Sequence, residues 1–428
     1  MKIPPEFENW SKRDFVRLIL TEREFFRTKI EELERRLLAY ENAHTPPSKR
    51  KDHYPKSEGS SGKQGAPVGH EGTTRPTASP TETKTLHLDL CPDCHSILGK
   101  PVRVERRVVE ELPEPQPLRV IEFFIPHYNC KKCKKEIIPA HSELPKSGRL
   151  GNNLQSQIVL MKYEDRLPLR KIITPLNREH PLGLTAATIL DVLRRAAHRL
   201  KPEYKKIKRE IRKSTRAHAD ETGSKVEGKN HWLWLFMSKI SVLFVFRKRR
   251  EAEVIEEILG KNYKGVLTVD GLKAYRKIVK LIQRCWAHLL RDAKFLAQKH
   301  EGQARILYAS LCELFEQVKQ QTISYKNAIS KMKMFLQIAQ AYQELRKFAT
   351  TLENGLEHWF TCLIYPDVEP TNNRAEQQLR EFVIQRKIYP TYRSETGPQN
   401  TVILMSLLAT WKLRGLNPLT MLRQNLSS

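Results

Sequence analysis

The feature that most constrains the fold is a pair of short apolar segments in the C-terminal half that each end in an aspartate. Residues 216–220 end at Asp220, and residues 266–270 end at Asp270. Between them the sequence predicts a strand hairpin and a helix, over residues 231–240, 242–247 and 250–259. Strands that alternate with helices predict an α/β domain. Ligand sites in such domains gather at the carboxyl ends of strands, so we expect both aspartates at a functional site.

A third acidic residue, Glu376, lies within a predicted helix over residues 372–388. Three converging carboxylates repel one another unless cations neutralise them. Carboxylate oxygens select Mg²⁺ or Mn²⁺, and two such ions about 3.5–4 Å apart can hold a phosphodiester between them. We therefore expect two ions per active site. The pattern alone leaves Glu221 open as an alternative to Asp220, and Glu369 as an alternative to Glu376.

The charge balance of the chain restricts the class of partner. The 428 residues include 75 Lys and Arg against 48 Asp and Glu, a net charge of +27. Such an excess predicts a polyanionic partner, and nucleic acid is the commonest; a ribosome-associated or heparin-binding protein is the alternative. Neither a membrane-spanning run nor the apolar core of a signal peptide is apparent, so a cytoplasmic protein of two to four domains, with no membrane partner, is expected.

The N-terminal part is predicted to be a coiled-coil helix over residues 9–42, followed by a flexible linker over 43–85. Apolar residues recur at alternating steps of three and four from Val16 to Tyr40, and only Arg23 interrupts them. This heptad pattern favours a self-associating helix and hence a homodimer. An amphipathic helix packed on its own domain is the alternative. The linker has almost no large apolar side chains, so it cannot bury enough surface to offset its ordering entropy.

Residues 86–145 carry two CxxC pairs, Cys91 with Cys94 and Cys130 with Cys133. In a cytoplasmic protein such pairs indicate metal binding rather than disulfides. Four thiolates on two turns give tetrahedral coordination of a structural Zn²⁺, as in a zinc ribbon. Two β-rich segments, residues 101–109 and 118–125, are predicted strands between the pairs. Candidate substitute ligands are His95, His127 and His141.

Residues 148–212 are predicted to be helical and to bind DNA. A short helix begins near Pro168, a turn contains Gly183, and Thr185 caps a further helix that extends to about Leu200. That arrangement is typical of a helix-turn-helix, and a plain helical hairpin fits nearly as well. The polar face of the last helix offers candidate DNA-binding residues, which are Thr188, Arg194 and Arg195.

Several longer motifs then give the chain a specific resemblance. They are Asp220-Glu-Thr-Gly223, Val269-Asp-Gly-Leu-Lys-Ala-Tyr275, Cys285-Trp-Ala-His288 with Arg291, Asn372-Asn-Arg-Ala-Glu376 with Arg380, Arg386-Lys387, Ser394 to Gly397 and Gly415-Leu-Asn-Pro418. In this order they resemble the insertion-sequence-66-type transposases over nearly the whole chain. Thr371 departs from the family pattern, which usually has Asp there, and the segment after His288 matches only loosely.

The resemblance implies a catalytic triad of Asp220, Asp270 and Glu376 on a ribonuclease H-like core, within a multidomain α/β protein. This core would span residues 214–428, with a helical insertion at about 292–360 before the glutamate. The matched motifs also supply five candidate auxiliary residues, which are His288, Arg291, Asn373, Arg380 and Lys387. Cys285 and Trp286 are expected to pack in the core, although Cys285 and His288 also have the spacing of a metal-binding pair.

The expected function is DNA transposition. The enzyme would bind the terminal inverted repeats of its element, cut one strand at each end and join the freed 3′-hydroxyl to target DNA, with accessory proteins of the element as possible partners. One alternative is a DNA-binding protein derived from a transposase that is catalytically silent or needs helper proteins. Another is a ribonuclease H-like nuclease that cleaves without joining strands.

Overall fold

The computed structural model describes residues 11, 13, 20–24, 26–30, 79–110 and 117–427, and the chain divides into two units, residues 1–49 with 120–428 and residues 50–119. Residues 20–24 and 26–30 are helical. Leu20, Phe26 and Ile30 are each more than half exposed. The remainder of the predicted coiled coil and residues 43–78 of the predicted linker lie outside the described residues.

A five-stranded mixed sheet forms the centre of the larger unit, in the order β5-β4-β3-β6-β7. Its strands are β3 (Arg216–Val226), β4 (Lys229–Met237), β5 (Val242–Arg247), β6 (Val266–Val269) and β7 (Ile282–Arg284). The first three strands along the chain are antiparallel neighbours, whereas β6 pairs in parallel with β3 and β7 pairs in parallel with β6. This arrangement confirms the predicted α/β core; β7 was not predicted.

Strand β3 extends beyond the end that the sequence predicts. The segment was expected to end at Asp220, but Gly223 also lies within the strand and pairs with Trp232 of β4. The turn comes at Glu227 and Gly228, whose φ angles are 49° and 76°. Two consecutive residues with positive φ give a hairpin turn whose twist matches that of the strands. The predicted end was too early because β3 stays paired in register with β4 as far as Val226.

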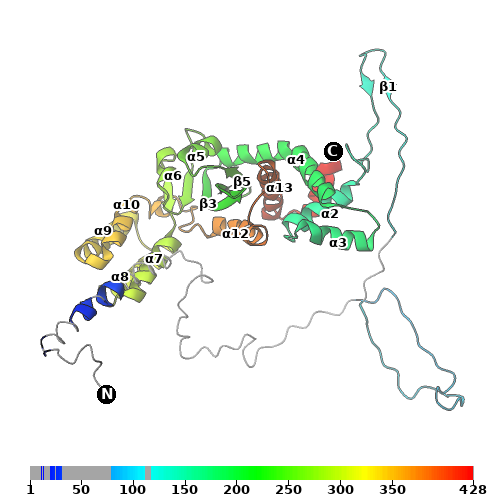
Figure 1. Ribbon diagram of the computed structural model, residues 1–428, viewed down its shortest axis with the longest axis horizontal. Helices are drawn as coiled ribbons and strands as arrows, with labels where there is room; N and C mark the ends of the chain where they lie inside the picture. Colours follow the sequence, from blue (N-terminus) through cyan, green and yellow to red (C-terminus); the bar gives the residue numbers. More distant parts are fainter. Residues whose placement is uncertain are drawn as a thin grey trace. The chain divides into compact units, whose positions relative to one another are not determined.

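Helices surround the sheet. They include α2 (Asn152–Tyr163), α3 (Leu169–Glu179), α4 (Ala186–Lys213), α5 (Ala252–Leu259), α6 (Lys273–Ile278), α12 (Asn373–Ile388), α13 (Thr396–Leu413) and α14 (Pro418–Ser427). Figure 1 shows α4 and α12 on opposite sides of the strands. Helix α12 contacts β3 and β4, and α13 contacts β5.

The free edge of β5 is covered by α13. The hydroxyl oxygens of Thr410 and Ser406 accept hydrogen bonds from the backbone N–H groups of Val242 (2.9 Å) and Phe244 (2.8 Å). An uncovered edge strand leaves its backbone groups open to pairing with another chain. Helix α13 therefore closes one side of the sheet.

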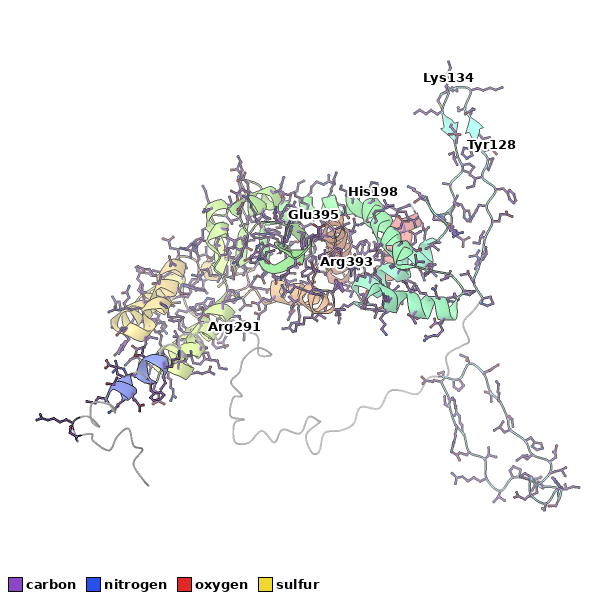
Figure 2. The ribbon with its side chains drawn as sticks, in the orientation of Figure 1. Tyr128, Lys134, His198, Arg291, Arg393 and Glu395 are labelled. Atoms are coloured by element: carbon purple, nitrogen blue, oxygen red, sulfur yellow. The ribbon has the colours of Figure 1, made fainter. Side chains whose placement is uncertain are left out.

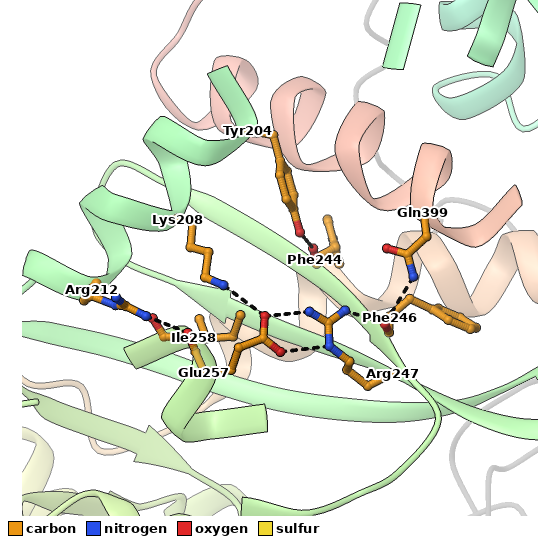
Figure 3. A network of polar contacts seen from close by, with 9 residues as sticks. All are labelled: Tyr204, Lys208, Arg212, Phe244, Phe246, Arg247, Glu257, Ile258 and Gln399. Carbon is orange, nitrogen blue, oxygen red and sulfur yellow. Dashed lines mark hydrogen bonds and ion pairs between the residues drawn. The ribbon is translucent and has the colours of Figure 1, made fainter. Parts of the chain in front are cut away.

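Helix α4 continues well past Leu200, where the sequence predicts its end, and runs through Pro202 to Lys213. Ile207 and Ile211 prolong its buried stripe. Polar contacts fix this extension to β5 and α5 (Figure 3): the Tyr204 hydroxyl donates to the Phe244 carbonyl at 2.8 Å, and the Lys208 ammonium donates to Glu257 at 3.0 Å. Tertiary packing thus outweighs the tendency of proline to end a helix.

The apolar residues of the larger unit form two clusters. One is shared by the sheet, the flanking helices and α2–α4, and includes Ile158, Leu193 and Leu235. The other belongs to the helices between β7 and α12, which are α7 (Trp286–Lys299), α8 (Gln303–Lys319), α9 (Tyr325–Ala341), α10 (Arg346–Gly355) and α11 (Thr361–Ile364). A helical segment with its own core thus separates Asp270 from Glu376.

The predicted strands at 101–109 and 118–125 do not form, although both segments are described. Val102, Val104 and Phe124 are almost fully exposed, and a strand without a paired neighbour leaves its backbone groups unsatisfied. The strands near Cys130 and Cys133 are instead the two-residue pair β1 (Tyr128–Asn129) and β2 (Glu136–Ile137). Figure 2 shows Lys134 at the outer end of this hairpin.

Across the part of the chain that the structure describes, no helix combines the length and the apolar character needed to cross a lipid bilayer.

Candidate active site

Parallel pairing of β3 and β6 brings Asp220 and Asp270 to matching positions. The register pairs Ala217 with Leu267 and His218 with Thr268. Asp220 and Asp270 come two residues after His218 and Thr268, so the same register places them opposite each other. Neighbouring strands lie about 4.8 Å apart. The two aspartates that the sequence predicts are therefore placed side by side at the end of β6.

The carboxylates of Asp220 and Asp270 repel each other and are weakly compensated. Burial, together with the nearby charges of Glu221 and Asp270, raises the pKa of the Asp220 carboxyl well above its usual range. The backbone N–H of Glu221 donates to Asp220 at 2.8 Å, and that of Leu272 donates to Asp270 at 2.9 Å. Neither carboxylate forms a salt bridge with any residue that the structure describes. Carboxylate oxygens that have no ion-pair partner fit a hard divalent cation.

Glu376 lies in the first turn of α12, the helix that packs on β3. Its charge, like that of Asp270, contributes to the raised pKa of Asp220, so both other members of the predicted triad act on Asp220. The carboxylate also faces α7: its Oε1 lies 3.5 Å from His288 Nδ1, and its Oε2 lies 3.9 Å from Arg291 Nη2. The structure thus brings two of the predicted auxiliary residues to the glutamate.

Asn372, immediately before α12, is fully buried and connects the elements that carry the triad. Its side-chain amide donates to the Ala219 carbonyl at 2.9 Å, and its Oδ1 lies 3.1 Å from His218 Nδ1. Its backbone carbonyl accepts the N–H of Glu376 at 3.1 Å. Asn372 therefore holds the start of α12 against the residue that precedes Asp220.

The remaining auxiliary predictions on α12 lie on its surface. Asn373, Arg380 and Lys387 are exposed. The neighbour of Lys387, Arg386, instead reaches β3 and donates to Thr222 Oγ1 at 3.2 Å and to the Gly223 carbonyl. Arg386 and Asn372 both lie in motifs that the sequence analysis singled out, but linear sequence gives no indication of which member of an adjacent pair turns inward.

The two alternative acids have partners of their own. Glu221 accepts hydrogen bonds from the Tyr275 hydroxyl at 2.5 Å and from Arg250 Nε at 2.9 Å. Glu369 pairs with Arg374 at 3.2 Å. Sequence reasoning missed Arg250 and Tyr275 as partners of Glu221. The signal available for Tyr275 was its place in the motif that begins at Val269.

Each CxxC pair forms the same backbone turn. In the first, the Cys91 carbonyl accepts the N–H of His95 at 2.9 Å, and His95 has a φ of 55°. In the second, the Cys130 carbonyl accepts the N–H of Lys134 at 2.8 Å, and Lys134 also has a φ of 55°.

Local hydrogen bonds favour thiolates within both turns. Those from Ser96 lower the pKa of Cys94 to about 7, and those from Cys133 lower the pKa of Cys130. Cys91 and Cys94 belong to the smaller unit, and Cys130 and Cys133 belong to the larger.

The predicted DNA-binding residues occupy different environments on α4. Arg194 is exposed and pairs with Asp191 at 2.5 Å. Arg195 also pairs with Asp191, at 2.9 Å, but its side chain is only 19% exposed and donates to the Ser147 carbonyl. Thr188 lies in the first turn, where its backbone N–H donates to the Thr185 side chain at 3.3 Å. The predicted helix cap at Thr185 is thereby confirmed.

Comparison with known proteins identifies the family of the chain. Residues 147–400, more than half of the chain, match the Transposase IS66 family. Two curated relatives come from Sinorhizobium fredii (strain NBRC 101917 / NGR234). The uncharacterized protein y4jD is 22% identical over 71% of this chain and 68% of its own length. The uncharacterized protein y4qI is 25% identical over 68% of this chain and 61% of its own length. The chain thus spans about two thirds of the length of these relatives. With its acids placed as described and more than half of its length matched, the chain belongs to the IS66 family of transposases.

Proposed function

We propose that the protein is a DNA transposase with a metal-dependent active site of Asp220, Asp270 and Glu376 on a ribonuclease H-like core. The observation that carries this proposal is the parallel register of β3 and β6, which aligns Asp220 with Asp270 below a helix that carries Glu376. The sheet order and the helical segment between Asp270 and Glu376 support the same core.

The three carboxylates would hold two Mg²⁺ or Mn²⁺ ions. Divalent cations in such a site activate an attacking oxygen and stabilise the leaving oxygen of a phosphodiester. First, the oxygen of a water forms a bond to phosphorus while the bond to the 3′-oxygen breaks, which frees a 3′-hydroxyl at the element end. That hydroxyl then attacks a target phosphodiester, and the target strand leaves through its own 3′-oxygen.

The protein groups around the triad have separate tasks. Asp220 and Asp270 supply oxygen ligands from the rigid sheet, and Asn372 keeps Glu376 close to them. His288 and Arg291 face Glu376 from α7, so they can balance its charge or contact a DNA phosphate.

DNA is the proposed partner, with terminal inverted repeats read by residues N-terminal to the sheet. The net charge of +27 supports a polyanionic partner. The CxxC turns support a structural Zn²⁺, and the exposed apolar residues of the N-terminal helix are compatible with self-pairing.

The test uses the full-length protein, DNA that carries an element end, and Mg²⁺. Nicked and joined products are expected from the parent protein. Asp220→Asn, Asp270→Asn and Glu376→Gln should each lose cleavage while end binding is retained. Cleavage without joining would favour a nuclease, and binding without cleavage would favour a silent or helper-dependent protein. Full cleavage by any one variant would remove that residue from the mechanism.

A further inference from the structure

A second group of possible metal ligands lies beside the carboxylate pair. One ligand atom each from Cys285, His288 and Glu376 lie within 4.8 Å of one another. The side chains come from two helices: Cys285 is the residue before α7, His288 lies in the first turn of α7, and Glu376 lies in the first turn of α12. The group therefore forms where two helix N-termini meet.

The environment of the Cys285 sulfur favours a ligand role. Cys285 is fully buried, and its Sγ accepts the backbone N–H of Asn372 at 3.1 Å. The positive end of the α7 dipole also favours negative charge at this position. Burial raises the pKa of the Cys285 thiol, whereas the N–H groups of Asn372 and His288 act in the opposite direction. A bound cation would stabilise the Cys285 thiolate, which burial alone disfavours.

The third possible ligand of the group is the Glu376 carboxylate. Its Oε1 is buried and receives no hydrogen bond from the residues that the structure describes, although His288 Nδ1 lies 3.5 Å away. Arg291 lies 3.9 Å from the other oxygen, Oε2, so its charge is nearer the opposite side of the carboxylate. Glu376 Oε1 is therefore placed to share an ion with the two side chains of α7.

The geometry points to a transition-metal site in which Cys285, His288 and Glu376 bind an ion such as Zn²⁺. One sulfur, one nitrogen and one oxygen ligand select Zn²⁺ over Mg²⁺. Three protein ligands leave a fourth position open. The ion would hold Glu376 from the α7 side, while Asp220 and Asp270 approach from the sheet. Only the role of Glu376 in cleavage rests on the proposed function; ion binding by this group does not.

The test counts zinc in full-length protein without DNA. Protein purified with zinc and dialysed against metal-free buffer is analysed for metal content. Cys285→Ser and His288→Gln should each lose about one zinc per chain relative to the parent. Cobalt substitution should show part of the thiolate-to-cobalt absorption missing in Cys285→Ser. The CxxC turns do not affect this comparison, because every variant retains them.

Two control variants make the result decisive. Cys362→Ser alters another buried thiol, and Asp220→Asn alters the neighbouring carboxylate site; both should keep the zinc content of the parent. Thermal unfolding of each variant checks that zinc loss does not follow from misfolding, and His288→Gln stands in if Cys285→Ser fails to fold. Unchanged zinc in Cys285→Ser and His288→Gln would overturn the inference, as would equal loss in Asp220→Asn. Zinc loss in a protein that cannot cleave DNA would uphold this site while rejecting the proposed function.

Discussion

The two faces of strand β3 carry adjacent acids in opposite electrostatic situations. Asp220 shares its face with His218, on the side that α12 covers. Glu221 points to the other face, where Tyr275 and Arg250 bind it. The Asp220 carboxylate is partly buried and has no salt bridge among the described residues, whereas the Glu221 carboxylate is buried with a cation and a hydroxyl donor.

Under the proposed function, Glu221 would have a structural role and Asp220 a role in the chemistry. A buried charge that is paired and hydrogen-bonded stabilises its surroundings, whereas an uncompensated one destabilises the fold unless a ligand neutralises it. Burial raises the pKa of both side chains, and Asp270 adds to the effect on each. The side chains of Tyr275 and Arg250 oppose this shift at Glu221, whereas a backbone N–H opposes it at Asp220. The face of β3 that carries Asp220 is therefore the one expected to bind cations.

The largest expected effect is on catalysis. Asp220→Asn should reduce Mg²⁺-dependent nicking of an element end by at least about 10³-fold, equivalent to a loss of about 4 kcal/mol of transition-state stabilisation. Glu221→Gln should reduce it by less than about tenfold, because this side chain acts through Tyr275 and Arg250. Single-turnover cleavage rates of the two variants measure the contrast. Equal losses would mean that the two faces do not differ in function.

A smaller effect is expected from the residue that holds the α12 face together. Asn372→Ala removes the hydrogen bonds to Ala219 and His218, and should lower cleavage by about 10- to 100-fold, as for other residues that orient metal ligands. Its exposed neighbour provides the control: Asn373→Ala should leave the rate within about twofold. The Mg²⁺ concentration for half-maximal rate should rise in Asn372→Ala only. If both variants behaved alike, Asn372 would not position Glu376.

Stability should depend on pH in a way that separates the faces. The pKa of Asp220 is raised in the folded state, so the folded protein binds the proton more tightly than the unfolded chain does. The stability associated with this group is present at acidic pH and is lost as pH rises from about 4, the unfolded value, through the raised folded pKa. Glu221 contributes in the same direction.

This dependence can be measured by thermal unfolding at a series of pH values upward from about 4, the ordinary carboxyl pKa. In Mg²⁺-free buffer the midpoint should fall as pH rises, and added Mg²⁺ should reduce the fall. Asp220→Asn should flatten the profile and stabilise the metal-free protein. Glu221→Gln should destabilise it by about 1–3 kcal/mol, because Arg250 loses the opposite charge and one of the two acceptor oxygens is replaced by a donor. A parent profile that is level without Mg²⁺ would contradict the assignment.

Much of the sheet region could be predicted from sequence, since short apolar segments and strand-terminal acids are local signals. Asp220 and Asp270 were expected at one site, and the structure brings them to neighbouring positions; the insertion was expected from the resemblance. The ends of elements were less predictable. The strand was expected to end at Asp220 and the helix at about Leu200. Pairing with β4 extends β3 past Gly223, and a buried apolar stripe extends α4 past Pro202. Such tertiary effects depend on residues distant in the sequence.

The partners of the acids could not be predicted for a related reason. Arg250 is 29 residues from Glu221, and Asn372 is 153 residues from Ala219. No local pattern connects such pairs, and folding alone brings them together. The β-rich segments beside the CxxC pairs show the opposite failure, because local propensity predicted strands for which the structure provides no pairing partner.

The smallest expected effect extends the comparison to α4, where adjacent arginines differ as the acids of β3 do. Arg195 is bound to Ser147 and Asp191, while Arg194 keeps 63% of its side chain exposed. Arg194→Ala should weaken binding to element-end DNA a few-fold and reduce the slope of log affinity against log salt concentration by about 1, the contribution of one phosphate contact. Arg195→Ala should mainly lower the free energy of unfolding, by about 1–2 kcal/mol, because the Ser147 carbonyl and Asp191 lose a donor. Salt titrations of DNA binding and thermal unfolding, applied to both variants, separate the two roles. If Arg195→Ala changed the salt slope while Arg194→Ala did not, the less exposed arginine would be the one that contacts DNA.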